Sequence, residues 1–259
     1  MSRIAIIGSN YTLMSRSEMV GTLLSDAHQG KSGYVCVSNV HTTMMGFFDR
    51  NYQAITNQSQ YSVPDGVPLV WAMNAMGASQ DRIRGPSLMR DLCDQGRASG
   101  LKHFLYGSSP KTLGHLKQYL ENQYPGIQIV GAVSPPFRAL TEAEMKSAAE
   151  EINASGANIL WVGLGAPKQE RWMFAQRNQV KPIMLGVGAA FDLLPGIVPE
   201  APVFLQTLGL EWLYRLYREP KRLWRRYIFN NPAFLALLAL QVFQARVFRR
   251  RYLIDEKHG

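Results

Sequence analysis

Short apolar runs rich in β-branched and aromatic residues recur along the chain between segments with helical spacing. Such runs, bounded by glycine, proline and polar residues, are typical of buried strands. They occupy residues 3–8, 34–40, 103–109, 127–133, 158–165 and 182–188. From residue 104 to residue 187 strands and helices alternate, and this rhythm predicts parallel strands covered by helices on both faces.

Helix-start signals stand between several of these runs. Pro86 and Pro110 each precede a segment with helical spacing, and proline is favoured in the first turn of a helix. Thr141 and Glu144 have the spacing of a capping box. We therefore expect an α/β fold with a Rossmann-like, mostly parallel sheet that carries helices on both faces.

Composition and cysteine usage limit the class of protein. The chain has 259 residues, of which 46 % are apolar, enough to bury one large domain or one domain with an appendage. Cys36 and Cys93 form no C-x-x-C motif, which argues against a disulfide framework or a zinc site and favours a reducing compartment. Only four consecutive apolar residues follow Arg3, too few for a signal peptide, and no stretch approaches the roughly 20 apolar residues of a spanning helix. We expect a cytoplasmic protein.

The net charge of +9 is concentrated near the C-terminus. Residues 211–251 contain ten Lys and Arg against two acidic residues, so this segment carries +8 and the rest of the chain +1. Leucines and large aromatic residues alternate with the bases, as suits the headgroup layer of an anionic membrane. Nucleic-acid binding is less favoured, because the bases form no purely polar arm. We predict an α/β domain over residues 1–210 and a basic, amphipathic helical appendage over residues 211–259 that associates with membranes.

Polar and glycine-rich stretches follow three of the predicted strands, at residues 38–41, 163–170 and 188–192. Binding sites in parallel sheets lie beyond the carboxyl ends of the strands. Asp65, in a Pro-Asp-Gly turn before a helix, is a fourth candidate. Taken singly, each has a structural explanation: Pro-Asp-Gly is a common turn, His41 at a helix start is more often structural, and glycines permit close packing.

Six segments together resemble, in their order and spacing, the WecG/TagA/CpsF glycosyltransferases, glycosyltransferase family 26. They are residues 38–41, 64–72, 82–89, 152–172, 186–202 and 208–227, and the similarity extends over nearly the whole chain. It implies that residues 1–210 bind a UDP-sugar and catalyse its transfer, with inversion, to a lipid-diphosphate-linked acceptor. This reaction would take place at the cytoplasmic membrane face, in assembly of cell-surface polysaccharide or teichoic acid. The donor sugar stays open.

The resemblance also implies roles for single residues. Asp65 matches the family's proposed general base, which takes the proton of the acceptor hydroxyl. Arg82 matches an arginine beside the donor phosphates, whose oxygens suit its planar fork. Glycine turns and helix N-termini can hold a diphosphate without a Walker lysine. The expected donor pocket comprises Ser38, Asn39, His41, Gly163, Gly165, Gln169 and Asp192 at the sheet edge, with Arg215, Arg222 and Arg225 either completing it or binding anionic lipid.

The sequence contains no Asp-x-Asp motif of the kind that holds a divalent metal in many glycosyltransferases. We therefore expect a metal-independent reaction without a cofactor, in which arginines and helix dipoles stabilise the leaving diphosphate. Two positions depart from the family pattern. Residues 135–137 read Pro-Pro-Phe where relatives often have Gly-Tyr-Phe, and Ser87 stands in place of the aspartate where relatives often have Gly-Pro-Asp-Leu.

Two other functions remain as alternatives. Residues 3–9, RIAIIGS, suggest a nucleotide-dependent oxidoreductase, although the full glycine fingerprint and an acidic residue about 20 positions on are missing. A noncatalytic, membrane-associated module that binds a UDP-sugar is the second. The expected partners are the UDP-sugar, the lipid-linked acceptor and an anionic membrane surface, but not nucleic acid. A homo-oligomer is one option that the sequence leaves open.

Overall fold

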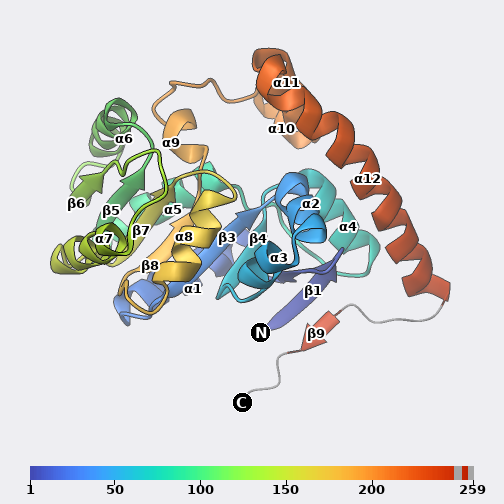
Figure 1. The fold of residues 1–259 in the computed structure, drawn as a ribbon, viewed down its shortest axis with the longest axis horizontal. Helices are drawn as coiled ribbons and strands as arrows, with labels where there is room; N and C mark the ends of the chain where they lie inside the picture. Colours follow the sequence, from blue (N-terminus) through green and yellow to red (C-terminus); the bar gives the residue numbers. More distant parts are fainter. Residues whose placement is uncertain (248–252, 256–259) are drawn as a thin grey trace.

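The computed structural model describes residues 1–247 and 253–255, and the side chains of all of these except residues 222, 225, 226, 246, 247 and 255. Six parallel strands form the central sheet, in the order β4-β3-β8-β7-β5-β6. They are β3 (Gly33–Ser38), β4 (Tyr61–Pro64), β5 (Lys102–Gly107), β6 (Gln128–Val133), β7 (Ile159–Gly163) and β8 (Ile183–Gly186). With helices on both faces of this sheet, the predicted α/β, Rossmann-like fold is confirmed (Figure 1).

Three of the described strands were not predicted, and the first predicted run lies outside the central sheet. β4 was not predicted, because its four residues end at Pro64 and are too few to show a period of two. The first predicted run forms β1 (Ser2–Ile6), which pairs antiparallel with β2 (Ser9–Thr12) and β9 (Leu253–Asp255) in a separate sheet. Because β1 continues into a hairpin and not into a helix, the RIAIIGS stretch lacks the strand–turn–helix context of a dinucleotide fingerprint.

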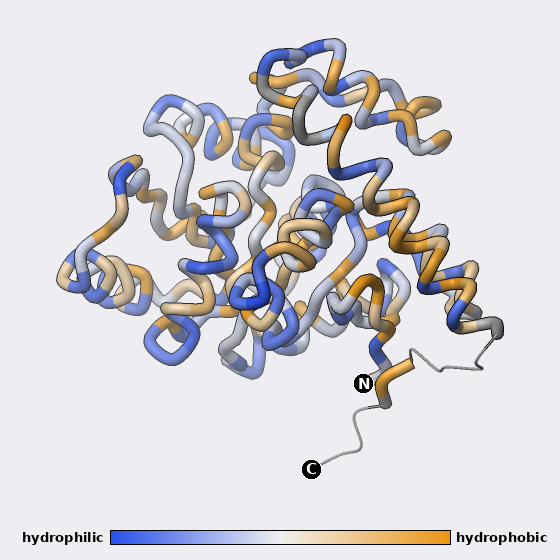
Figure 2. The backbone as a smooth tube through the Cα atoms, turned by 45° about the vertical axis from the view of Figure 1, so that its right-hand side comes forward, coloured by the Kyte–Doolittle hydropathy of each residue, from blue (hydrophilic) through white to orange (hydrophobic). Residues whose placement is uncertain are grey.

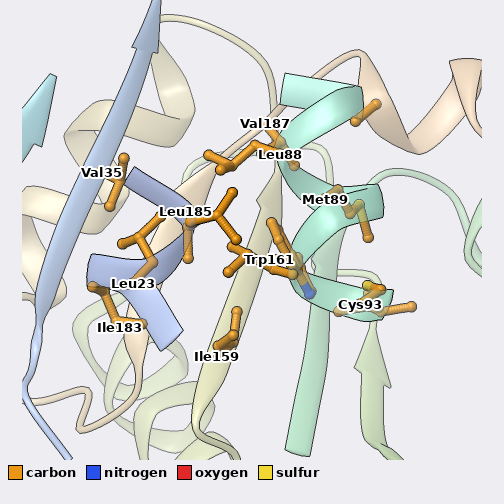
Figure 3. Packing of buried hydrophobic residues seen from close by; sticks show 14 of the residues in the cluster. Leu23, Val35, Leu88, Met89, Cys93, Ile159, Trp161, Ile183, Leu185 and Val187 are labelled. Carbon is orange, nitrogen blue, oxygen red and sulfur yellow. The ribbon is translucent and has the colours of Figure 1, made fainter. Parts of the chain in front are cut away.

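Side chains of the central strands point alternately into two apolar layers. In β7, Ile159 and Trp161 pack on one side, and Leu160 and Val162 on the other. Figure 3 shows Trp161 in the middle of the first layer, facing the helix that carries Leu88, Met89 and Cys93. The first layer is closed by α1 (Arg16–His28), α5 (Gly85–Gly96) and α6 (Pro110–Gln123), and the second by α7 (Glu142–Ala154) and α8 (Lys168–Gln176).

The predicted helix starts are confirmed. α5 and α6 each have a proline in the first turn, and Ser109 caps α6 by accepting the Thr112 N–H at 3.1 Å. Thr141 and Glu144 form the capping box of α7: the Thr141 hydroxyl accepts the Glu144 N–H, and the Glu144 carboxylate accepts the Thr141 N–H. These caps fix the points at which the chain leaves the sheet and enters the helices.

A third apolar cluster lies outside the central sheet. It joins Ile4 and Ile6 of β1 to Met44, Met73 and Phe234, which come from three helices. These helices are α2 (Val40–Phe48), α4 (Val67–Ala75) and the long C-terminal α12 (Pro220–Val247). The remaining elements are α3 (Arg50–Asn57), η1 (Arg97–Ser99), α9 (Ala190–Leu193), α10 (Val203–Thr207) and α11 (Glu211–Arg218).

α12 is anchored to the body through one of its sides. Phe234 is 1 % exposed, and the Gln241 side chain accepts the Ile7 N–H at 2.8 Å and donates to the Ala5 carbonyl at 2.7 Å. Apolar stretches continue along the helix, which runs beside the body from α11 towards β9 (Figures 1 and 2). The predicted domain boundary after residue 210 stays a prediction, but the segment beyond it shares a core with β1, α2 and α4.

Part of α12 meets the length and composition of a membrane span. Among the described residues, one helical segment meets both criteria, Tyr227–Ala245. It has 19 residues and a mean hydropathy of 1.3, and 6 % of it is buried. The expectation that no stretch approaches this length is therefore wrong for α12. Uninterrupted apolar runs in this segment are short because Asn and Gln residues interrupt them, but the segment stays apolar on average. Length and composition alone do not show that the helix crosses a membrane.

Candidate active site

The carboxyl ends of β3 and β4 bring Ser38, Asn39 and Asp65 together. Ser38 pairs in register with Pro64, and the Asp65 N–H donates to the Ser38 carbonyl at 2.7 Å. Asn39 caps α2, because its Oδ1 accepts the backbone N–H groups of His41 and the following threonine at 3.0 and 3.3 Å. This bond fixes the amide orientation and leaves the Asn39 Nδ2 as a donor at the edge of the sheet.

Asn39 and Asp65 line a cavity of about 80 Å³. Arg82, in the segment between α4 and α5, and Arg215 of α11 line the same cavity. Four of the residues predicted from the sequence therefore meet in one place, although 176 positions separate the first from the last. The Nε of Arg215 is buried and makes no hydrogen bond within the described part of the chain.

Asp65 combines accessibility with a raised proton affinity. Burial raises the pKa of its carboxyl above the ordinary value, while 28 % of the side chain stays accessible from the cavity. Arg82, with its Nη2 3.8 Å from Asp65 Oδ1, opposes this rise in pKa, and the charge of Glu211 reinforces it. A carboxylate of raised pKa is a better proton acceptor than an ordinary one, as a general base requires.

Arg82 is clamped between acceptors. Its Nε donates to the Asp65 carbonyl, and its Nη2 donates to the Glu211 carboxylate at 2.7 Å. The side chain is 19 % exposed. A guanidinium fixed in this way keeps a constant orientation beside Asp65. Its positive charge could stabilise a phosphate oxygen there without the side chain having to move first.

An ion-pair network behind the cavity was not predicted from the sequence. Arg84 lies between Glu200 at 3.2 Å and Glu211 at 3.4 Å, and Arg90 also pairs with Glu200. Burial acts to raise the pKa of Glu211, but the charges of Arg84 and Arg82 outweigh it and hold the pKa below its ordinary value. Glu211 therefore stays ionised and ties the segment between α4 and α5, which carries Arg82 and Arg84, to α11. In the sequence, the one feature that could have indicated this network is Glu211 itself, an acidic residue at the start of a helix whose other charged residues are basic.

The glycines beyond the strands have different roles. A Cβ on Gly163 would lie 2.6 Å from the Phe191 ring, and one on Gly107 would lie 2.6 Å from the Gly163 carbonyl carbon. Close packing therefore explains both of these residues. Gly165 has a φ of +75° but open space around an added Cβ. At Gly165 the backbone conformation requires glycine, and the space above it can accept a ligand.

Gln169 supports this glycine turn from below. It is 4 % exposed, its Oε1 accepts the Gly165 N–H at 3.2 Å, and its Nε2 donates to Glu170 at 2.8 Å. Ser38 is buried to a similar extent. The predicted donor contacts of Gln169 and Ser38 stay predictions, because the structure gives both residues a role in shaping the loops.

A second cavity of about 330 Å³ lies beyond β5, β6 and β7. Gly163, Lys168 at the first position of α8, and Phe137 line it. Trp172, also in the wall, stacks on Tyr106 with 4.4 Å between the ring centroids. The cavity thus combines an exposed aromatic ring, a cation and a glycine turn next to the sheet edge.

Of the other predicted site residues, His41 and Asp192 line neither of these two cavities. His41 begins the helix after Asn39, and its Nδ1 is 2.8 Å from the Nδ2 of Asn230 on α12. Asp192 is partly buried on the short α9. The side chains of Arg222 and Arg225 fall outside the described residues. In the described ranges, no group of three or more His, Cys, Asp or Glu side chains could hold a metal ion.

A parallel sheet with glycine turns and polar side chains beyond its strand ends has the architecture in which ligands bind at the carboxyl edge of the sheet. The family model described as "Glycosyl transferase WecG/TagA/CpsF family" matches residues 4–248. The chain belongs to this glycosyltransferase family, as the sequence resemblance predicted. One relative is the N-acetylglucosaminyldiphosphoundecaprenol N-acetyl-beta-D-mannosaminyltransferase of Bacillus spizizenii. It is 28 % identical over 202 residues, which are 77 % of this chain and 76 % of the relative.

Proposed function

We propose that this glycosyltransferase moves a sugar from a UDP-sugar to a lipid-diphosphate-linked acceptor, with inversion and without a metal ion, in assembly of a cell-envelope polymer. The meeting of Asn39, Asp65, Arg82 and Arg215 in one cavity carries the proposal. A metal-independent transfer needs a base for the acceptor hydroxyl and cations for the leaving diphosphate. The name of the Bacillus spizizenii relative, which specifies a diphosphoundecaprenol-linked sugar, supports the acceptor class.

In the proposed reaction Asp65 takes the proton from the acceptor hydroxyl. The hydroxyl oxygen forms a bond to the anomeric carbon, and the bond from that carbon to the UDP oxygen breaks. Arg82 and Arg215 face the charge that grows on the leaving diphosphate. A direct displacement inverts the anomeric centre and requires one carboxylate, whereas a retaining reaction through a covalent intermediate requires a second carboxylate as nucleophile.

The donor would lie across the ends of β7, β8 and β3. In the sheet order, β7 and β3 are two inter-strand steps apart, a span of about 10 Å. We propose that Phe137 stacks on the uracil in the second cavity and that the diphosphate passes over Gly165, near the N-terminus of α8. The positive end of this helix and Lys168 favour an anion there. The donor sugar then reaches Asn39 and Asp65.

We also propose that the protein works at the inner membrane face, with α11 and α12 in the interface. The exposed residues Phe229, Leu235 and Phe243 and the charge of +8 support membrane binding. Phe234 and Gln241 fasten the middle of the candidate span to the body. While these contacts persist, the helix cannot cross a bilayer, so peripheral association is favoured over spanning.

The two alternatives make different predictions. The motif that suggested an oxidoreductase no longer supports that function, because residues 3–9 belong to a hairpin outside the central sheet. UDP should raise the unfolding temperature, and NAD or NADP should leave it unchanged. The binding-module reading has no turnover, and so it is tested by UDP release in the presence of an acceptor.

The decisive assay measures UDP release from a panel of UDP-sugars with a lipid-diphosphate-sugar acceptor. We expect acceptor-dependent release with one donor sugar and full activity in excess EDTA. Activity that EDTA abolishes and magnesium or manganese restores would contradict the metal-independent reaction. Binding of UDP-sugars without turnover on any acceptor would support the noncatalytic module.

A further inference from the structure

A large apolar groove lies between the body and the C-terminal helices. Its volume is about 700 Å³, within the range of small-molecule sites. α4 contributes Trp71, Ala72 and Ala75 to one wall, and α12 contributes Leu235 and Leu238 to the other. Of the described residues that line it, none is Asp, Glu, Lys or Arg. An occupant of this groove must therefore be largely hydrocarbon.

The groove adjoins the Asp65 cavity. Asn39, Gly66, Pro68 and Trp212 line both spaces. A molecule held in the groove can therefore have one end beside the reacting centre. The arrangement suits one molecule that has a polar end at Asp65 and an apolar remainder along α4 and α12.

Polar groups are confined to the end of the groove near the α2 N-terminus. There His41 and Asn230 form a hydrogen bond across the gap between α2 and α12. Towards the other end the lining is apolar, and Leu235, which is 60 % exposed, reaches from the groove to the outer surface of α12. A chain that leaves the groove at Leu235 would enter the surface that we place in the membrane interface.

We propose that this groove binds the polyisoprenyl chain of the acceptor next to its diphosphate, so that the sugar at the other end of the diphosphate reaches Asp65. The proposal rests on the proposed function and adds the place where the lipid is recognised. The shared walls favour a chain attached to the substrate over a second copy of this protein or a separate helix, because neither of these needs a connection to the reacting centre.

The test compares two acceptors with the same sugar-diphosphate head. One carries a long polyisoprenyl chain, and the other carries a single isoprene unit and is soluble in water. Ala75→Trp fills the groove from an exposed position of α4, and Ala239→Trp adds the same ring to an exposed position of α12 outside the groove. We expect Ala75→Trp to lower the ratio of kcat/KM for the long over the short acceptor by about tenfold. Ala239→Trp should leave the ratio unchanged.

The possible outcomes distinguish a failure of the lipid-groove proposal from a failure of the proposed function. If the unmodified protein transfers sugar to neither acceptor, the proposed function is contradicted. If it uses both and Ala75→Trp leaves the ratio unchanged, the lipid groove is overturned and the function stands. A concentration-dependent dimer that Ala75→Trp dissociates in sedimentation would also overturn the proposal, since the groove would then be an interface between copies.

A binding measurement needs no bulky variant. Trp71 is 59 % exposed and lines the groove, so a brominated dodecyl phosphate bound there should quench its fluorescence. We expect saturable quenching in the unmodified protein and a clear reduction in Trp71→Phe. Trp212 also lines the groove, so a Trp71→Phe, Trp212→Phe double variant removes both of its tryptophans. Equal quenching in the unmodified protein and in this double variant would place the alkyl chain elsewhere and overturn the proposal.

Discussion

At the edge of the central sheet, the backbone is fixed by strand register and by glycines such as Gly107 and Gly163 that leave no room for a Cβ. The C-terminal helices are fixed differently. Ion pairs of Glu211 with Arg82 and Arg84, and buried residues such as Phe234, hold them to the body. The sheet edge, which we propose binds the donor, is thus held by close backbone packing, and the helices that we propose bind the acceptor are held by side-chain contacts. The candidate base lies at the junction of the two regions.

This comparison changes the role of the basic appendage. From composition alone, residues 211–259 were expected to associate with membranes. In the structure, Glu211 and Arg215 also line the cavity of Asp65 and influence its pKa. The start of the appendage therefore belongs to the site, and the exposed face of α12 is the part left for a membrane.

Substitution of Asp65, at the junction of the two regions, should have the largest effect on turnover. Asp65→Asn keeps the shape of the side chain and removes the proton acceptor, so we expect kcat to fall by about 10²–10⁴-fold with UDP binding retained. Asp94→Asn is the control, because that side chain is 54 % exposed and lies on α5. Near-normal turnover in folded Asp65→Asn protein would exclude Asp65 as the base.

The attachment of α12 is tested by truncating Phe234. If α12 unfolds together with the body, Phe234→Ala should lower the free energy of unfolding by about 3–5 kcal/mol, as expected for a buried phenylalanine. Phe229→Ala, on the same helix but 66 % exposed, should cost less than about 0.5 kcal/mol. Urea unfolding measures both. Equal stability of the two variants would show that α12 is an independent appendage, as a boundary at residue 210 implies.

The sequence predicted the body better than this junction. The continuous apolar run within residues 158–165 indicates burial on both faces of the strand, and caps such as Thr141 are local, so both are readable from neighbouring positions. The pairing of Arg84 with Glu211 spans 127 positions, and the bonds of Gln241 to β1 span more than 230. No local period encodes such partners, and the family resemblance, which supplied Asp65 and Arg82, did not supply these contacts.

The donor side offers a matched pair of glycines. Gly165 and Gly30 have φ values of +75° and +65°, and neither has an atom within 4 Å of an added Cβ. Gly165→Ala and Gly30→Ala should therefore lose similar stability, about 1–2 kcal/mol. If the diphosphate passes over Gly165, only Gly165→Ala should weaken UDP binding, on the order of tenfold or about 1.4 kcal/mol. Calorimetric titration with UDP measures this difference, and equal affinities in the two variants would move the diphosphate away from Gly165.

The smallest expected effect, a shift of under about one pH unit in the activity profile, tests the electrostatic link between body and appendage. Asp65 acts as a base when ionised, so the acid limb of kcat/KM should lie above the pH expected for an ordinary aspartate, because burial raises its pKa.

Arg82→Gln removes a charge that lowers this pKa, and the limb should move to higher pH. Glu211→Gln removes a charge that raises it, and the limb should move to lower pH. Glu121→Gln, on the exposed side of α6, should leave the midpoint unchanged. Shifts of the same sign in Arg82→Gln and Glu211→Gln would mean that the limb reports a group other than Asp65.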